Sequence, residues 1–281
     1  MEQRVIDQEA IGRFRLFLEE EEKCEATVMK YVRDVKAFAG YAGDAELSKE
    51  TVIAYKQSLL HKGYATRSIN SMLASLNAFF THQGWADLRV KAMKLQQQAF
   101  CAEEKELTRG EYERLCMAAK RKRRESLFLI LQTICSTGIR VSELAYITAE
   151  AVRKGKAEVY LKGKIRTVLL PTALRKKLQR YLSRRQIKEG PVFLSRSGKP
   201  LNRSVIWREM KSLCAEASVN PGKVFPHNLR HLFARVFYNL EKDIVKLADV
   251  LGHSSVETTR IYIISSGLEH RQRMERMHLV I

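Results

Sequence analysis

The sequence lacks the apolar stretch that a membrane-spanning or secreted chain needs. No run of apolar residues in its 281 positions approaches the roughly 18 required to cross a bilayer. The first residues, Met1 to Val5, are polar and do not form the apolar core of a signal peptide. We therefore expect a soluble protein that stays in the cytoplasm and makes no contact with a membrane.

Cysteine is scarce and irregularly spaced. The five cysteines are odd in number and form no C-x-x-C pair: Cys24, Cys101, Cys116, Cys135 and Cys214. This pattern is typical of reduced, mostly buried thiols, and neither a disulfide framework nor a zinc site is predicted. His227 and His231 lie four residues apart, as in zinc proteases, but that motif has glutamate after the first histidine and here Asn228 follows. We expect no metal and no cofactor.

Acidic residues are too few to balance the basic ones, and the excess is uneven. The formal net charge is +19. Residues 1–100 hold 14 Lys+Arg against 13 Asp+Glu, whereas residues 101–281 hold 36 against 18. A basic segment joined to a nearly neutral one favours a polyanionic partner, above all nucleic acid, because lysine and arginine displace counterions from phosphates. The alternative is a basic protein that its charge merely keeps in solution.

The chain is long enough for two domains, each with its own core. Apolar residues recur at three- and four-residue steps along residues 7–39 and in two later segments that end at Gly63 and Gly84. This periodicity predicts an all-helical domain over residues 1–95. Residues 96–106 lose the periodicity and are interpreted as a linker.

The second predicted domain, residues 107–281, combines helices with a little sheet. Thr108 and Glu111 have the spacing of a capping box at a helix start. An apolar helix over residues 127–137 ends at Gly138, and Arg140 follows at the junction with the next helix. Two β-rich segments flank Lys162-Gly163-Lys164 and predict a hairpin. The expected fold class is mostly α with a small β-sheet: a helical domain followed by an α+β domain.

Polar residues of catalytic type gather in the last quarter of the chain. Arg230 follows His227 by three residues, so on a helix the two side chains share one face. Gly252 is a predicted helix stop that places His253 in a turn, and Tyr262 belongs to the helix just beyond. Two histidines, an arginine and a tyrosine in this arrangement are more than a fold requires.

These residues resemble the tyrosine recombinase family of integrases and Xer-type recombinases. The matching segments, in the family's order and at similar spacing, are Thr137 to Leu144 (T-G-I-R-V-S-E-L), His227 to His231 (H-x-x-R-H), Leu251 to His253 (L-G-H) and Thr258 to Tyr262. Four such segments together are a specific signal, although each alone is weak. By motif the resemblance covers residues 107–281, and residues 1–95 match only in general character.

The resemblance implies a site-specific recombinase or integrase that cuts and rejoins double-stranded DNA through a 3′-phosphotyrosyl link, without ATP. Two arginines would bind the phosphate, and a tyrosine would be the nucleophile. One histidine would act as base or hold the phosphate, the other would donate a hydrogen bond, and the hairpin lysine would protonate the leaving 5′ oxygen. The implied catalytic set is Arg140, Lys162, His227, Arg230, His253 and Tyr262. Lys162 is chosen over Lys164 because it precedes the glycine.

The resemblance also suggests DNA contacts and self-assembly. The candidate contacts in the first domain are Lys62, Thr66, Arg67 and Asn70, and those on the hairpin are Lys164 and Arg166. For the first four, an ordinary polar helix surface remains an alternative. Dimers and tetramers are expected to form on DNA. The basic tail, residues 268–281, either docks on a neighbouring subunit or packs on its own domain.

Alternatives and departures from the family remain open. A type IB topoisomerase would share the tyrosine chemistry, and a DNA-binding protein with an inactive site would share only the fold. Arg140 could also belong to a purely structural ion pair with Glu143. The family's usual aspartate about ten residues after the first arginine is replaced near Glu150, and Arg235 stands where a small residue is usual.

Overall fold

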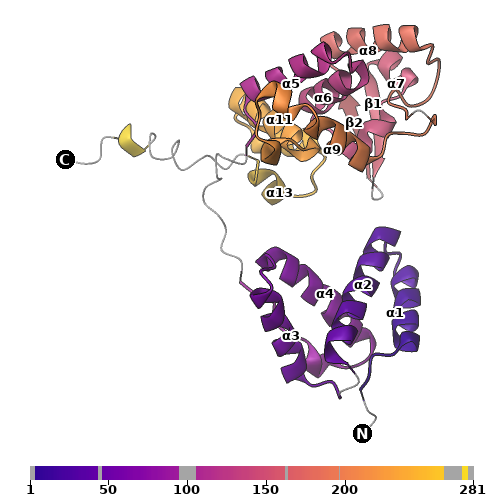
Figure 1. Ribbon diagram of the computed structural model, residues 1–281, viewed down its shortest axis with the longest axis vertical. Coiled ribbons are helices and arrows are strands. Elements are labelled where there is room, and N and C mark those ends of the chain that lie inside the picture. The colour runs from indigo at the N-terminus through magenta and orange to yellow at the C-terminus, as the bar shows by residue number, and fades with distance from the viewer. Residues whose placement is uncertain are drawn as a thin grey trace. The chain divides into compact units, whose positions relative to one another are not determined.

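The computed structural model describes residues 4–43, 46–94, 106–161, 164–195, 197–262 and 274–277. The chain divides into two compact units, Met1–Gln97 and Gln98–Ile281 (Figure 1). The predicted fold class, mostly helical with a small sheet, is confirmed. The predicted linker, residues 96–106, lies outside the described residues except for Glu106. Of the described helices, none is long and apolar enough to cross a membrane.

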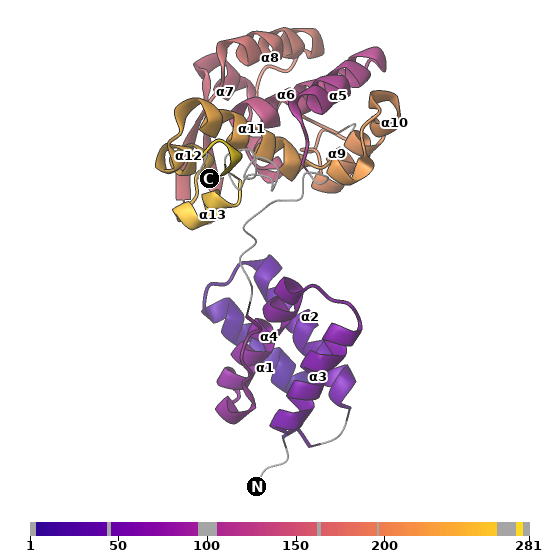
Figure 2. The same ribbon diagram turned by 90° about the vertical axis from the view of Figure 1, so that its left-hand side faces the viewer.

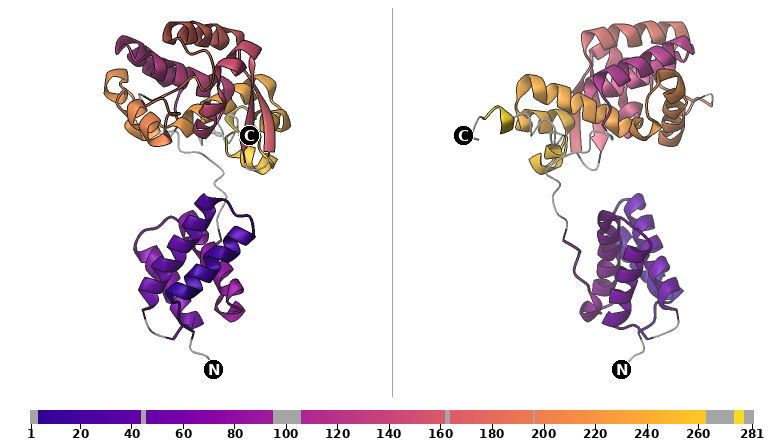
Figure 3. Two further views of the ribbon diagram at one scale, coloured as in Figure 1. Left: turned by 90° about the vertical axis from the view of Figure 1, so that its right-hand side faces the viewer. Right: turned by 60° about the vertical axis from the view of Figure 1, so that its left-hand side comes forward.

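The first unit is a helical bundle whose helices pack side by side (Figure 3). Its elements are α1 (Gln8–Glu20), α2 (Glu25–Ala42), α3 (Lys49–His61), α4 (Thr66–His82) and η1 (Ala86–Leu88). Fully buried phenylalanines form the centre: Phe14, Phe38, Phe79 and Phe80. The Asp34 carboxylate is also buried there, and it accepts hydrogen bonds from Ser75 at 3.0 Å and from Arg33 while pairing with Lys30 at 2.9 Å. The buried charge is therefore compensated.

The second unit contains more and shorter elements. They are α5 (Arg109–Arg121), α6 (Glu125–Thr137), η3 (Val141–Tyr146), α7 (Ala149–Lys154), β1 (Lys156–Leu161), β2 (Lys164–Leu169), α8 (Thr172–Arg185), α9 (Arg203–Lys211), α10 (Cys214–Ala217), η4 (Pro221–Lys223), α11 (Pro226–Glu241), α12 (Ile244–Leu251) and α13 (Val256–Arg260). The predicted capping box is confirmed at α5, where Glu111 N–H donates to Thr108 Oγ1 at 3.2 Å and Thr108 N–H donates to Glu111 Oε2 at 2.8 Å.

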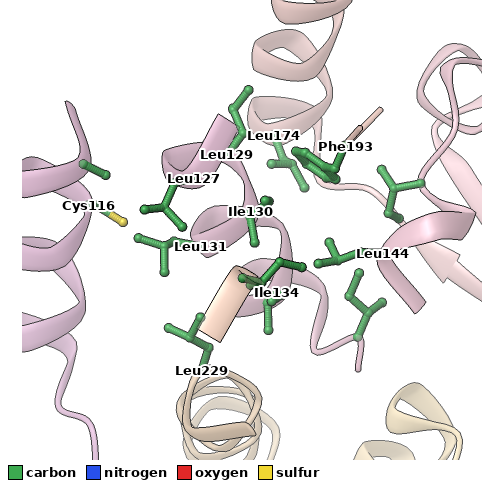
Figure 4. Packing of buried hydrophobic residues seen from close by; sticks show 14 of the residues in the cluster. Cys116, Leu127, Leu129, Ile130, Leu131, Ile134, Leu144, Leu174, Phe193 and Leu229 are labelled. Carbon is green, nitrogen blue, oxygen red and sulfur yellow. The ribbon is translucent and has the colours of Figure 1, made fainter. Parts of the chain in front are cut away.

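Helix α6 is the centre of the second unit. It packs against α5, α8 and α11, and Figure 2 shows these helices gathered around it. Its apolar residues occupy more than one face, as expected of a helix that is buried nearly all round. Figure 4 shows Ile130 and Ile134 between Leu229 of α11 and Leu144 of η3. The helix therefore fixes its own C-terminal end, at Gly138, against α11.

The two strands form the predicted hairpin. Strands β1 and β2 pair antiparallel, with Val159 opposite Arg166 and Leu161 opposite Lys164. The turn, Lys162 and Gly163, lies outside the described residues. Val159 and Val168 are buried on one face of the hairpin, whereas Ile165 is exposed. The sheet is thus anchored by one face, which fixes the direction in which the side chains of β2 point.

Candidate active site

Arg140 is placed by the end of α6. Gly138 ends the helix in the left-handed conformation, at φ 65°. Arg140 then begins η3, and Glu143 accepts a hydrogen bond from the Arg140 N–H at 2.7 Å and another from its Nη1 at 3.0 Å. The Arg140 side chain nevertheless remains 35% exposed. The ion pair therefore exists and leaves part of the guanidinium open to a ligand.

Glu143 is fully buried yet keeps its charge. Its carboxylate also accepts from Arg166 Nη2 at 2.5 Å. Burial alone would raise the pKa of Glu143, but the Arg140 N–H and the charges and hydrogen bonds of Arg166 and Arg140 outweigh it and hold the pKa below its ordinary value. One buried carboxylate thus holds two arginines from different elements.

Arg230 is the largest of the fully buried side chains, at 1% exposure. Its Nη1 donates to the carbonyl of Gly138, and its Nη2 donates to the carbonyl of Leu251 at 2.8 Å and to His253 Nε2 at 2.7 Å. Burial, and then the charge of Arg140, lowers the pKa of Arg230 to about 10, so it is still protonated at pH 7. Its Nε is buried without a partner in the structure.

His253 is held in one tautomer. Because Arg230 can only donate, His253 Nε2 accepts, and the ring proton must lie on Nδ1. Nδ1 then donates to Thr259 Oγ1 at 2.8 Å. Burial lowers the pKa of His253 to about 4, with help from the charges of Arg230 and Arg140, so the ring is neutral at pH 7. His253 therefore has an N–H that can donate a hydrogen bond, as predicted, and in this structure it donates to Thr259.

Tyr262 lies among three histidine rings and is 3% exposed. Its ring centre is 5.5 Å from that of His253, 5.6 Å from that of His227 and 4.2 Å from that of His231. Burial and the nearby His227 and Arg235 lower the pKa of His231 to about 4. Tyr262 is therefore surrounded by neutral imidazoles. It also interacts with Arg230, one of the two predicted arginines.

An open cleft of about 540 Å³ is lined by Arg140, His227 and Arg230 together with Arg203 and Trp207 of α9. His227 is exposed in it. Packing around the ring and the charges of Arg230, Arg140 and Arg203 lower the pKa of His227. Neither Arg203 nor Trp207 was singled out from the sequence. Both lie on α9, whose cap is Asn202: its Oδ1 accepts from the N–H of Ser204 at 2.7 Å.

Two candidate DNA contacts have other partners in the structure. Arg166 is 14% exposed and turns inward to Glu143 and to the carbonyl of Val250. Asn70 uses its amide to bind both the N–H and the carbonyl of Met93, at 2.8 and 2.9 Å. Both residues therefore make hydrogen bonds within the protein, and their contact with DNA stays a prediction.

The remaining predicted residues are partly described. Lys62 and Arg67 are exposed on the first unit, and Thr66, half-buried, begins α4. Lys162 and the side chain of Lys164 lie outside the described residues.

Arg235, Glu150 and the C-terminal tail were also singled out in the sequence. Arg235 pairs with Glu106 and Glu150 accepts from the Gly190 N–H, so both have partners away from the cleft. Of the tail, only residues 274–277 are described. Within the described ranges, no group of three or more His, Cys, Asp or Glu could hold a metal ion.

Gly138 ends α6, and its carbonyl accepts a hydrogen bond from Arg230, so we expect a substitution at Gly138 to destabilise the protein. A Cβ there would lie 2.4 Å from Phe233 Cδ1, in addition to requiring a left-handed backbone. We expect Gly138→Ala to cost about 1–2 kcal/mol for the backbone and about 1–3 kcal/mol more for the clash. Gly190→Ala is the control, because Gly190 has φ 73° and open space. Equal losses in urea unfolding would contradict the proposed clash.

Comparison with known proteins identifies the family of this chain. The model described as "Phage integrase family" matches residues 105–267, and the model "Phage integrase, N-terminal SAM-like domain" matches residues 11–85. The chain therefore belongs to the phage integrase family. The predicted membership of the tyrosine recombinases, as an enzyme class, is confirmed.

Two curated relatives cover the whole chain and about half of it, respectively. The tyrosine recombinase XerA of Pyrococcus furiosus is 29% identical over 291 residues, which cover 100% of this chain and 98% of the relative. The tyrosine recombinase XerD of Xanthomonas campestris is 35% identical over 164 residues, which cover 53% of this chain and 50% of the relative.

Solved structures show the same fold. A lambda integrase dimer bound to a COC′ core site has a TM-score of 0.74 at 18% identity, covering 92% of this chain and 95% of that one. The XerH recombinase in a pre-cleavage complex with difH has a TM-score of 0.69 at 16% identity, covering 96% and 94%. At such identities the likeness supports the fold alone.

Proposed function

We propose that this protein is a site-specific DNA recombinase that cuts and rejoins double-stranded DNA through a covalent 3′-phosphotyrosyl intermediate, without a metal ion or ATP. The observation that carries the proposal is the convergence of Arg140, His227, Arg230, His253 and Tyr262 from four separate segments. The first three line one cleft. His253 bonds to Arg230, and the buried ring of Tyr262 packs beside the rings of His253 and His227. A fold alone has no need of two arginines and a buried tyrosine at the same place.

The two arginines supply charge where a phosphate would gain it. Arg230 is held by two main-chain carbonyls, so its guanidinium needs little reorganisation when a substrate binds. Arg140 is held by Glu143 and remains partly exposed in the cleft. Planar guanidinium groups bind two phosphate oxygens at once and stay protonated at pH 7. Fixed positive charge of this kind stabilises the phosphorane that forms when a nucleophile attacks phosphorus.

The proposed reaction balances with the groups of this chain. The phenolic proton of Tyr262 passes to His227 or to water, and the phenolate oxygen attacks the phosphorus. The bond from phosphorus to the 5′ oxygen breaks, and that oxygen takes a proton from Lys162, the proposed acid. His227 suits the first step because its lowered pKa leaves it unprotonated at pH 7. The phosphotyrosyl link conserves the bond energy, so rejoining is the same step in reverse.

The proposed partner is double-stranded DNA, and the proposed active assembly is a dimer or tetramer formed on it. Residues 101–281 carry most of the positive charge. Solved relatives include a lambda integrase tetramer bound to a Holliday junction. Exchange of strands between two duplexes requires four active sites, and DNA can bring subunits together by raising their effective concentration.

A covalent-complex assay tests the proposal. The protein is mixed with nicked duplexes taken from the flanks of its own gene, in EDTA and without nucleotide. We expect a denaturant-resistant adduct on the 3′ end at the nick, which disappears after protease treatment. No adduct, a 5′ adduct or a need for Mg²⁺ would overturn the mechanism. Relaxation of supercoils without exchange between two duplexes would favour a topoisomerase instead.

The charge distribution predicts how binding responds to salt. With roughly six to ten phosphate contacts, affinity is expected to fall by about 10³-fold or more between about 50 and 200 mM salt, because each contact releases a counterion. Fluorescence anisotropy with a labelled half-site measures the slope. A nearly flat dependence would show that the basic surface of residues 101–281 does not face the DNA.

A further inference from the structure

Arg166 extends from the hairpin into the active site. It lies on β2, four residues after Lys162, and is 14% exposed. Its Nη2 donates to Glu143 at 2.5 Å, and its Nη1 donates to the carbonyl of Val250 at 2.6 Å. The side chain also packs closely against Gly252, where a Cβ would lie 2.3 Å from Arg166 Cδ. These contacts span 23 and 84 residues of sequence.

Each contact of Arg166 leads to a proposed catalytic group. Glu143 Oε2 accepts from Arg166 and also from the Arg140 N–H at 2.7 Å, so the carboxylate that orients Arg140 is itself oriented by Arg166. Val250 and Gly252 end α12 immediately before His253. The strand that carries Arg166 begins two residues after Lys162 in the sequence. One guanidinium therefore joins three segments that other contacts link in pairs. Tyr146 of η3 donates to the carbonyl of Tyr160 in β1, and Arg230 links Gly138 to Leu251.

Only an arginine can make this junction. Its two terminal nitrogens point in different directions, toward a carboxylate and toward a carbonyl, whereas a lysine presents a single nitrogen. The Arg166 Nε is buried without a partner in the structure. The position of the side chain therefore leaves one of its own donors unpaired, while it supplies donors to the Glu143 carboxylate and the Val250 carbonyl.

We propose that Arg166 is a positioning residue that couples the β1–β2 hairpin to Arg140 and His253, so that the hairpin and the segments that carry these two residues are in place together or not at all. The proposal rests on the proposed function for its effect on cleavage, but not for the coupling itself. It replaces the expectation that Arg166 contacts DNA.

The coupling has an electrostatic signature at Glu143. The charged groups that face the Glu143 carboxylate are Arg140 and Arg166. The charge of Glu143 also acts on Arg230, and the charge of Arg166 also acts on His253. Because burial raises the pKa of Glu143 and Arg166 opposes that effect, removing Arg166 must raise it. Protonated Glu143 no longer holds Arg140 by charge. The loss of cleavage on acidification should therefore begin at a higher pH.

The first test compares cleavage by Arg166→Ala, Arg166→Lys and Arg175→Ala. Arg175 is a matched control because its guanidinium also donates to main-chain carbonyls, those of Val152 and Arg153, far from the cleft. Single-turnover cleavage of a nicked half-site should slow by about 10- to 100-fold in Arg166→Ala. Arg166→Lys should lie between it and the wild type. Affinity should change little, and only Arg166→Ala should move the acid limb of the pH profile upward.

Three results would overturn the proposal: cleavage by Arg166→Ala equal to that of Arg175→Ala, a parallel loss of affinity and rate, or an unmoved acid limb. The second of these would restore the DNA contact.

Amide hydrogen exchange separates this proposal from the proposed function, because it needs no cleavage. In Arg166→Ala, residues 139–146 and 250–254 should both exchange faster than in the wild type, and in Arg175→Ala neither should. If the wild type forms no adduct, the proposed function fails and this exchange pattern still decides the coupling. Faster exchange in the hairpin alone would overturn it.

Discussion

Tyr262→Phe is expected to abolish the covalent adduct, with cleavage lowered by at least about 10⁴-fold, while affinity for a half-site stays within about threefold of the wild type. The substitution removes only the nucleophilic oxygen. The ring keeps its place against His227, His231 and His253, because those contacts are made by ring faces and edges. The phosphate-binding arginines come from other segments, and of the two only Arg230 interacts with the hydroxyl that is lost.

Tyr181→Phe is the matched control for this experiment. Tyr181 lies in α8 of the same unit and is buried to a similar degree, at 5% exposure against 3% for Tyr262. It should form the adduct at the wild-type rate. An adduct that survives in Tyr262→Phe would refute the assignment of the nucleophile. A wild type that binds half-sites tightly and never forms an adduct would favour the DNA-binding protein with an inactive site.

Arg230→Ala should lower cleavage by about 10²- to 10³-fold, as expected when a donor to the developing charge is removed. It should also destabilise the protein. The carbonyls of Gly138 and Leu251 lose their buried donor, at a cost of about 1–3 kcal/mol for each group that stays unsatisfied. His253 loses the donor that fixes its tautomer. Single-turnover cleavage and thermal unfolding measure the two effects separately.

Arg230→Lys tests which property of the residue matters. Lysine keeps the positive charge but can reach only one of the three acceptors of Arg230. We expect cleavage to remain at least about 10-fold below the wild type, because a single ammonium cannot bind two phosphate oxygens in a fixed plane. Wild-type cleavage by Arg230→Lys would show that charge alone is sufficient and that the fork geometry has no part in catalysis.

Local rules predicted the parts of this molecule whose partners are near in sequence. The capping box at Thr108, the helix stop at Gly138 and the turn at Gly252 depend on residues within one turn of each other, so spacing is enough to find them. The hairpin was found for the same reason. The proposed catalytic residues came from motif resemblance, and the structure brings the described ones together.

Contacts between residues far apart in the sequence could not be predicted. Arg166 was assigned to DNA because an arginine on a lysine-rich hairpin is ordinarily exposed, and nothing in the spacing shows that Val250 is its neighbour. The bond from Asn70 to Met93 was not predicted for the same reason, since Met93 lies 23 residues away. Arg203 and Trp207 follow a recognised cap, but only the packing of α9 beside α6 brings them into the cleft.

The positions of both Tyr262 and His253 depend on Thr259. This buried hydroxyl belongs to α13 and accepts a hydrogen bond from His253 Nδ1, and Tyr262 follows three residues later. A shift of α13 would withdraw the phenol and, at the same moment, remove the acceptor of His253 Nδ1, so that Arg230 alone would hold the imidazole. One small displacement would therefore disturb two groups simultaneously, and a subunit with Tyr262 withdrawn would not keep the rest of the site unchanged.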